Sequence, residues 1–217
     1  MTEGEPLIRW DWIGGHLDEI GQRLVEHVEL TAIAVGVGFV IAFGLALLII
    51  RRPRLESPIT FVTCTLYTIP SLALFVILIP YTGLSIVTAE IGLVSYTLLI
   101  LIRNIVRGIR GVPADVLEAA TGMGYTPRER LWRVEVPLAV AVIVAGVRVA
   151  TISTIGLVTV TALIGQGGFG YFILIGIQRF FSTELIVGAV CSVALAIGAD
   201  GLLVLLQRRL TPWTRSG

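Results

Sequence analysis

The charged side chains that could do chemistry gather in one short stretch, residues 116–137. This stretch mixes both signs: Glu118, Glu129 and Glu135 stand among Arg128, Arg130 and Arg133. The sequence on either side is apolar enough to enter a lipid bilayer. A mixed-charge segment between two apolar runs suits docking to a partner protein, because opposite charges across an interface fix partner and register.

Two further ionisable residues interrupt the apolar runs themselves. Arg148 lies 11 residues beyond Pro137 and Asp200 lies 8 residues before Arg208, so they sit about 16 Å and 12 Å along their helices. Charges inside a membrane are costly and usually pair or face an aqueous path. We expect Arg148 and Asp200 to lie close together in the bundle interior. The alternative is that each reaches the interface or a separate partner.

Several kinds of chemistry are excluded by residue type. All 16 basic residues are arginine, and a phosphate-binding P-loop needs a lysine, so any ATP and Mg²⁺ must be bound by another subunit. His16 and His27 both precede the first apolar run, and no His, Cys and acid cluster suggests a metal site. We therefore expect no enzyme, no metal and no cofactor in this chain. The net charge of +1 points to no nucleic-acid partner.

Composition and apolar length predict an all-α integral membrane protein. The chain is 55% hydrophobic and only 14% charged, with a mean hydropathy of +0.91, whereas a soluble domain is about 25% charged. A membrane span needs about 20 apolar helical residues. Five spans are expected, at about residues 30–50, 59–79, 89–106, 137–164 and 183–206. They form a transmembrane domain over residues 30–207, followed by a tail at 208–217.

Residues 1–29 are too acidic for a signal peptide, which begins with basic residues. Apolar residues recur there at helical spacing: Ile13, Leu17, Ile20, Leu24 and Val28. We expect a short amphipathic helix lying on the membrane surface. A frayed tail is the alternative.

The arginines predict which side each loop faces. With the N-terminus outside, the inner segments hold Arg51, Arg52, Arg54, Arg103, Arg107, Arg110, Arg128, Arg130, Arg133, Arg208, Arg209 and Arg215. The outer segments then hold only Arg9, Arg23 and Arg179. Positive charge favours the cytoplasmic side, so the N-terminus is expected outside, and residues 108–136 and the C-terminus inside.

Local signals predict that residues 108–136 form two short helices rather than a loose linker. Pro113 suits the first turn of a helix, and Gly122 and Gly124 mark its end. Thr126 and Glu129 have the spacing of a capping box, which begins a second helix running to about Val134. Pro137 is then expected to open the fourth span.

This segment resembles the EAA motif of ABC importer permeases. The matching residues are Glu118, Ala119, Ala120, Gly124, Val134 and Pro137. The resemblance implies that the segment inserts into an ATPase subunit and couples ATP hydrolysis to movement of the spans.

A closer resemblance covers roughly residues 25–210. YTIPSLAL (67–74), LIRNIVRG (101–108), AGVRVAT (145–151) and ALIGQGGFG (162–170) are similar to permease subunits for glycine betaine, choline, carnitine and related osmoprotectants. It implies the type I ABC importer, MetI-like permease fold. The glycine-rich segment, with Gly165, Gly167 and Gly168, would then face an extracytoplasmic substrate-binding protein. It cannot be a phosphate loop, since it follows no strand and has no lysine.

Pro70 and Ser71 are candidates for the translocation path. Pro70 removes a backbone hydrogen bond in the second span and should kink it. The kink could expose Thr68 and Ser71 to the path, or it could only shape the packing, which is the reading the sequence favours.

The resemblance also implies the surroundings. Two ATPase copies, a second permease copy or a homologous permease, a binding protein and membrane lipid are the expected partners, in a prokaryotic inner membrane. Other small solutes, such as an amino acid or another betaine-like compound, remain open. A channel or secondary transporter is the rival class, but it would not need the coupling segment, and no inverted repeat is evident.

Overall fold

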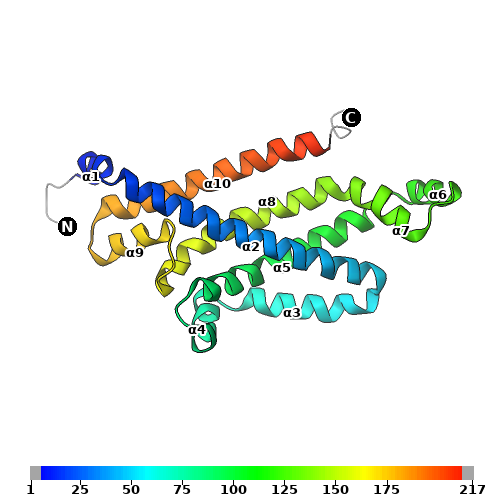
Figure 1. Ribbon diagram of the computed structural model, residues 1–217, viewed down its shortest axis with the longest axis horizontal. Coiled ribbons are helices and arrows are strands. Elements are labelled where there is room, and N and C mark those ends of the chain that lie inside the picture. Colours follow the sequence, from blue (N-terminus) through cyan, green and yellow to red (C-terminus); the bar gives the residue numbers. More distant parts are fainter. Residues whose placement is uncertain (1–5, 212–217) are drawn as a thin grey trace.

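The computed structural model describes residues 6–211, which form helices joined by short turns, with no strand in that range. The long helices are α2 (Leu17–Arg51), α5 (Ile86–Arg110), α8 (Val136–Thr161) and α10 (Ser182–Leu210). The shorter ones are α1 (Trp10–Gly15), α3 (Glu56–Thr68), α4 (Ser71–Thr82), α6 (Ala114–Gly122), α7 (Pro127–Arg130) and α9 (Gly170–Gln178). Helices α6 and α7 lie at one end of the molecule, and α1 and α9 lie at the other (Figure 1).

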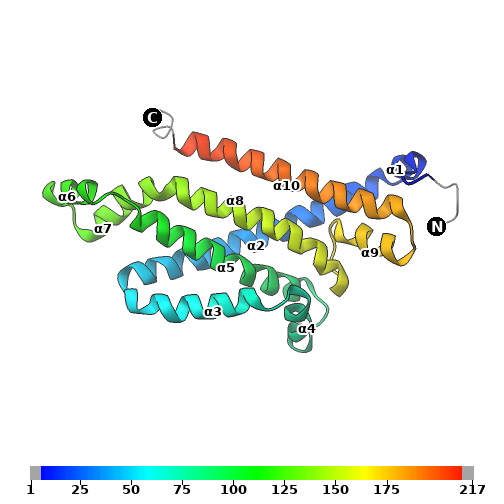
Figure 2. The same cartoon turned by 180° about the vertical axis from the view of Figure 1, so that it is seen from behind.

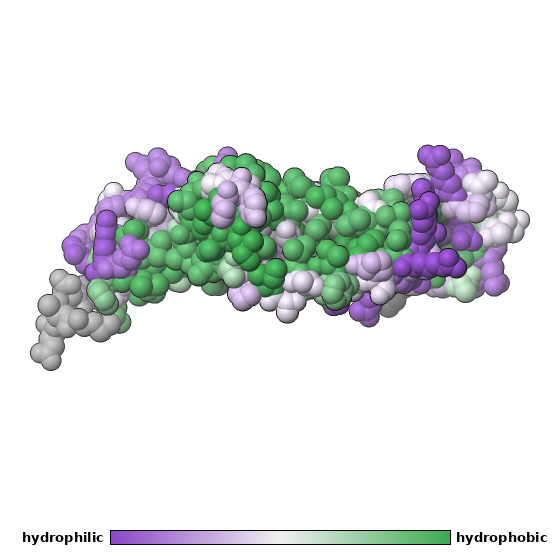
Figure 3. All heavy atoms as spheres, turned by 90° about the horizontal axis from the view of Figure 1, so that it is seen from below, coloured by the Kyte–Doolittle hydropathy of each residue, from purple (hydrophilic) through white to green (hydrophobic). Residues whose placement is uncertain are grey.

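A broad apolar belt separates two polar ends, as expected for a membrane protein (Figure 3). Within the described residues, four helices are long and apolar enough to cross a membrane. The bent pair formed by residues 53–68 and 71–82 makes a fifth crossing if it is counted as one span. The structure therefore agrees with about five spans, although one of them is broken.

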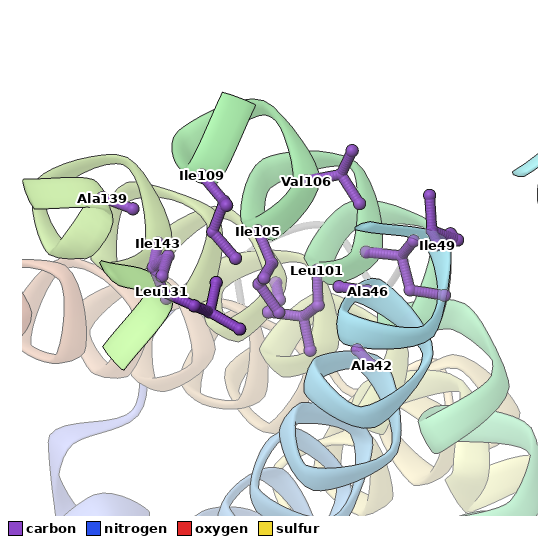
Figure 4. Packing of buried hydrophobic residues seen from close by; sticks show 12 residues of the cluster. Ala42, Ala46, Ile49, Leu101, Ile105, Val106, Ile109, Leu131, Ala139 and Ile143 are labelled. Atoms are coloured by element: carbon purple, nitrogen blue, oxygen red, sulfur yellow. The ribbon is translucent and has the colours of Figure 1, made fainter. Parts of the chain in front are cut away.

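The core is built where α2, α5 and α8 meet. Small residues on α2, Ala42 and Ala46, pack against Leu101 and Ile105 of α5 (Figure 4). A β-carbon on Gly38 would lie 1.9 Å from the Thr97 hydroxyl oxygen, so this glycine lets the two helices touch. Small residues permit such close approach in membranes, where packing rather than water drives association. Figure 2 shows the same bundle from behind, with α8 running across it.

The second span is not the single kinked helix that the sequence predicts. Helix α3 ends at Thr68, α4 begins at Ser71, and their axes differ by 99°. Proline disfavours helical backbone in the residue before it, and both Ile69 (ψ 129°) and Pro70 (ψ 133°) are extended. Two extended residues in a row turn the chain rather than bend the helix. Pro80, expected near the end of the span, lies inside the last turn of α4.

The N-terminal segment also differs from the expected separate surface helix. Only α1 stands apart, and residues 17–29 continue without a break into the first span as α2. The acidic residues there are spaced for ion pairs within the helix, and Arg23 pairs with both Glu19 and Glu26. Glu3 and Glu5 lie outside the described residues, as does most of the predicted tail, while Arg208 and Arg209 belong to α10.

The helix that contains the fourth span begins earlier than Pro137. Helix α7 passes through a π-helical turn (Leu131–Glu135) directly into α8, so the chain is helical from Pro127 to Ile164. Pro137 has no N–H to donate to an earlier carbonyl. The Val136 N–H bonds to the Leu131 carbonyl across the wider turn. The proline is thus accommodated within a continuous helix.

Candidate functional site

The two short helices predicted within residues 108–136 are present, and their ends are tightly closed. Helix α6 ends in a Schellman motif: the Tyr125 N–H bonds to the Ala120 carbonyl at 3.1 Å, and the Gly124 N–H bonds to the Thr121 carbonyl at 3.0 Å. Gly124 takes the left-handed conformation that this motif needs, with φ at 87°. Helix α7 then starts with the complete Thr126–Glu129 capping box.

The coupling residues predicted from the sequence divide into exposed and internal positions. Glu118 and Ala119 are exposed on α6, whereas Ala120 is buried beneath them. Val134 and Pro137 are half-buried in the continuous helix that follows. The first two can meet a partner directly, and the others shape the unit that carries them.

Ion pairs and core contacts fix this unit, which we call the α6–α7 unit (residues 114–135), to the bundle. Arg130 pairs with the buried carboxylate of Glu135 at 2.9 Å and donates to the Thr121 hydroxyl at 3.3 Å, joining α6 to the π turn. Leu131 is buried in the cluster with Leu101 and Ile105 (Figure 4). Force applied to α6 would therefore reach the transmembrane core.

Sequence reasoning missed Met123 as a candidate contact. Its side chain is 69% exposed beside Gly124, at the tip of the α6–α7 unit. An exposed methionine is apolar and adaptable, which suits a protein interface. Its place directly before the turn glycine was the available signal.

Pro70 and Ser71 line a pocket of about 330 Å³ at the break between α3 and α4. The other walls come from α5, through Tyr96 and Thr97, and from α8, through Ser153. The proline thus opens a polar hollow beside the break, in addition to shaping the packing. Tyr96 donates a hydrogen bond to the Ile69 carbonyl that the break leaves free.

Arg148 and Asp200 lie together, as the matching depths predict. The guanidinium makes two bonds to the carboxylate, at 2.8 Å and 3.0 Å, between α8 and α10. Gln207, which the sequence analysis did not single out, accepts from Arg148 at 3.4 Å and donates to the Ala141 carbonyl at 3.2 Å. Neither charged residue lines the pocket at the helix break, so the four candidates for the path form two separate groups.

The glycine-rich segment is held against the N-terminal part of α2. The Gly168 N–H donates to Glu26 at 3.0 Å, and the Phe169 N–H donates to Nδ1 of His27 at 3.2 Å. His27 is fully buried, and its other ring nitrogen lies 3.0 Å from the Ile155 carbonyl, to which it must donate. We call these contacts the outer latch (Glu26 and His27 with residues 167–169).

The outer latch accounts for Gly167 and Gly168 by close packing, whereas Gly165 has open space around it. A β-carbon on Gly167 would lie 1.9 Å from a Glu26 oxygen, and one on Gly168 would lie 3.0 Å from His27. Gly168 is buried, whereas Gly165 is exposed with φ at 76°. Any docking of a binding protein here falls on the exposed positions, and the docking role itself stays a prediction.

The bundle, its broken span and the stiff α6–α7 unit are the features of a membrane transport subunit. Residues 34–212 match the family model described as "Binding-protein-dependent transport system inner membrane component", and the chain belongs to this family.

Similar proteins agree with this assignment. The choline transport system permease protein OpuBB of Bacillus subtilis is 38% identical over 194 residues, covering 89% of each chain. The osmoprotectant import permease protein OsmW of Salmonella typhimurium is 38% identical over 192 residues, covering 86% of this chain and 89% of that one. Among solved structures, a chain of the MetNI methionine ABC transporter in an inward-facing conformation has a TM-score of 0.77 at 22% identity. It covers 88% of this chain and 96% of its own, which shows the MetI-like permease fold.

Proposed function

We propose that this chain is the membrane-spanning permease subunit of an ATP-driven importer for quaternary-amine osmoprotectants, such as choline, glycine betaine or carnitine. The α6–α7 unit carries the proposal. It presents Glu118, Ala119 and Met123 outward and is anchored to the core through Leu131. A soluble ATPase subunit could bind such a surface and move the transmembrane helices that are attached to it.

In this proposal two ATPase copies bind ATP and Mg²⁺ and move the α6–α7 units of two permease chains, which are two copies of this chain or one copy with a homologue. A binding protein delivers solute to the face that carries the outer latch. The N-terminus lies outside, and the α6–α7 unit lies in the cytoplasm, where the arginines concentrate. The names of the similar permeases support a quaternary-amine solute.

Co-purification tests whether the α6–α7 unit binds an ATPase subunit. Tagged wild-type chain, extracted in mild detergent from its native host, should bring down an ATPase subunit, and Glu118→Arg should lose it. The matched control is Asp18→Arg, a charge reversal at an exposed position on α2 at the opposite end of the molecule. Wild-type chain that emerges alone, or an ATPase that binds Glu118→Arg equally well, would contradict the docking role.

A transport assay in liposomes tests the proposed class of solute. The complete transporter in liposomes should accumulate labelled choline, glycine betaine or carnitine when ATP is supplied inside with the ATPase. Accumulation of an amino acid and of none of these amines would reject the proposed substrate class and leave the permease role standing.

A further inference from the structure

The pocket at the α3–α4 break gathers hydroxyl-bearing side chains in a part of the molecule that is otherwise apolar. Its hydroxyl-bearing lining residues are Tyr67, Thr68, Ser71, Tyr96, Thr97, Ser153 and Thr154. Non-helical backbone at membrane depth is tolerated only where protein covers it or where it lines an aqueous cavity. Ile69 and Pro70 have such non-helical backbone, and both line the pocket. The break is therefore consistent with a hydrated cavity at this position.

Several of these hydroxyls have no hydrogen-bond partner among residues 6–211, although Thr97 is not one of them. Thr97 bonds back to the Val94 carbonyl at 2.8 Å. The side-chain hydroxyls of Tyr67, Ser71 and Ser153 form no hydrogen bond to any residue between 6 and 211. Tyr67 is exposed, and Ser71 and Ser153 are half-buried, so these hydroxyls are open to water or to a polar solute in the pocket.

Two aromatic rings form one corner of the pocket. The rings of Tyr67 and Tyr96 have centroids 5.7 Å apart and planes inclined by 62°. Tyr96 is 6% exposed and is fixed by its bond to the Ile69 carbonyl, whereas Tyr67 is 43% exposed. Cations bind over aromatic faces at distances up to about 6 Å from the ring centre. The corner therefore has one fixed wall and one wall accessible to solute.

The charge of the lining narrows the ligand class. Within residues 6–211, no charged side chain lines this pocket. A primary ammonium would exchange its hydrogen bonds to water for the few hydroxyls here, with no carboxylate to balance its charge. A quaternary ammonium has no N–H to satisfy and is held well by aromatic rings.

We propose that this pocket is a transit site for the quaternary ammonium group of the transported solute, with Tyr67 and Tyr96 as its aromatic walls. This inference rests on the proposed function. A pocket without a carboxylate binds such a group weakly, and weak binding suits a transit site because solute must leave as readily as it enters.

The test uses the complete transporter in liposomes, with choline and glycine betaine as solutes. Tyr67→Phe keeps the aromatic face and should transport within about twofold of wild type, while Tyr67→Leu should transport about fivefold less or worse. Tyr81→Leu is the matched control, because Tyr81 is 85% exposed on α4 and does not line the pocket. Equal transport by Tyr67→Leu and wild type would overturn the transit site while leaving the proposed function intact.

A second measurement does not depend on the variants folding. Saturation-transfer NMR on the wild-type permease–ATPase complex, without binding protein, compares choline with its uncharged isostere 3,3-dimethylbutan-1-ol. We expect a choline signal several-fold stronger than that of the isostere. Equal signals, or none from choline, would overturn the site. Failure of the wild-type transporter to take up any quaternary amine would remove the proposed substrate and this inference together.

Discussion

Arg148 and Asp200 show how the chain carries charge through its apolar belt. The two-bond geometry satisfies both groups at once, and Gln207 takes up a further guanidinium N–H. Glu90 on α5, by contrast, has no charged partner to pair with among residues 6–211. The sequence suggests an interfacial position, yet both of its carboxylate oxygens are buried and have no hydrogen-bond partner among the described residues.

A charge swap tests the pair. Arg148→Asp and Asp200→Arg should each lower the yield of folded protein, because each leaves two like charges in the belt at a cost of about 2–3 kcal/mol. The double variant should recover much of the loss, as measured by the monodisperse fraction in detergent. Swapping the exposed pair Arg9 and Asp11, which are 44% and 71% exposed, should change almost nothing. A double variant no better than the singles would show that the contact contributes little.

Glu90→Gln should stabilise the chain. The amide keeps the shape of the side chain and removes an unpaired buried charge, whose desolvation is costly. We expect a gain of about 1–2 kcal/mol, or roughly 2–8 °C in thermal midpoint. Glu56→Gln is the opposing control and should lower the midpoint, since Glu56 holds Arg110 through two bonds at 3.0 Å and 2.8 Å. A lower midpoint for Glu90→Gln would contradict the unpaired charge and mean that the carboxylate is stabilised in the folded protein.

At the scale of elements, the α6–α7 unit owes its stiffness to closed helix ends. Every turn between Thr121 and Glu129 is held by a hydrogen bond that local residues supply. The π turn then passes the chain into α8 without a flexible joint. A partner that moved α6 would therefore move the start of the fourth span with it.

Two neighbouring glycines separate the effect of backbone conformation from that of packing. A β-carbon at Gly122 or Gly124 meets nothing within 4 Å, but only Gly124 has positive φ, at 87°. Gly124→Ala should cost about 1–2 kcal/mol, whereas Gly122→Ala should stabilise α6 by about 0.5–1 kcal/mol. The rate of tryptic cleavage after Arg128 should rise about fivefold or more for Gly124→Ala and should fall or stay level for Gly122→Ala. Identical rates would contradict the role assigned to the Schellman motif.

The elements predicted correctly are those whose ends are specified by nearby residues. Thr126 with Glu129, and Gly124 after α6, act over a few positions and leave a readable pattern. The 99° break was not predictable, because Pro70 permits a kink or a turn and packing against Tyr96 decides between them. The outer latch was also hidden, since His27 and Phe169 are 142 residues apart and only the fold brings them together. The Arg148–Asp200 contact could be predicted because a charge within an apolar span has few alternatives to pairing.

At the scale of the whole molecule, α8 connects every candidate site. It continues from α7, contributes Ser153 and Thr154 to the pocket, and offers the Ile155 carbonyl to His27 in the outer latch. Its inner end packs into the core with Leu131 (Figure 4). A displacement of the α6–α7 unit would thus be transmitted along one rigid helix to the pocket and to the outer face. In the proposed transporter, this geometry would let an ATPase at one end change solute access at the other.

Coupling through α8 requires the two ends of the molecule to lie on opposite sides of the membrane, and this orientation can be measured. In a background with Cys64→Ala and Cys191→Ala, we expect Asp18→Cys to react with a membrane-impermeant maleimide in right-side-out vesicles. Met123→Cys should react only in inside-out vesicles, because the arginine distribution places the α6–α7 unit in the cytoplasm. Adding the ATPase subunit should then slow the labelling of Met123→Cys and leave that of Asp18→Cys unchanged. Labelling of both positions from the same side would break the proposed mechanism, since α8 could no longer connect a cytoplasmic motor to an outer docking face.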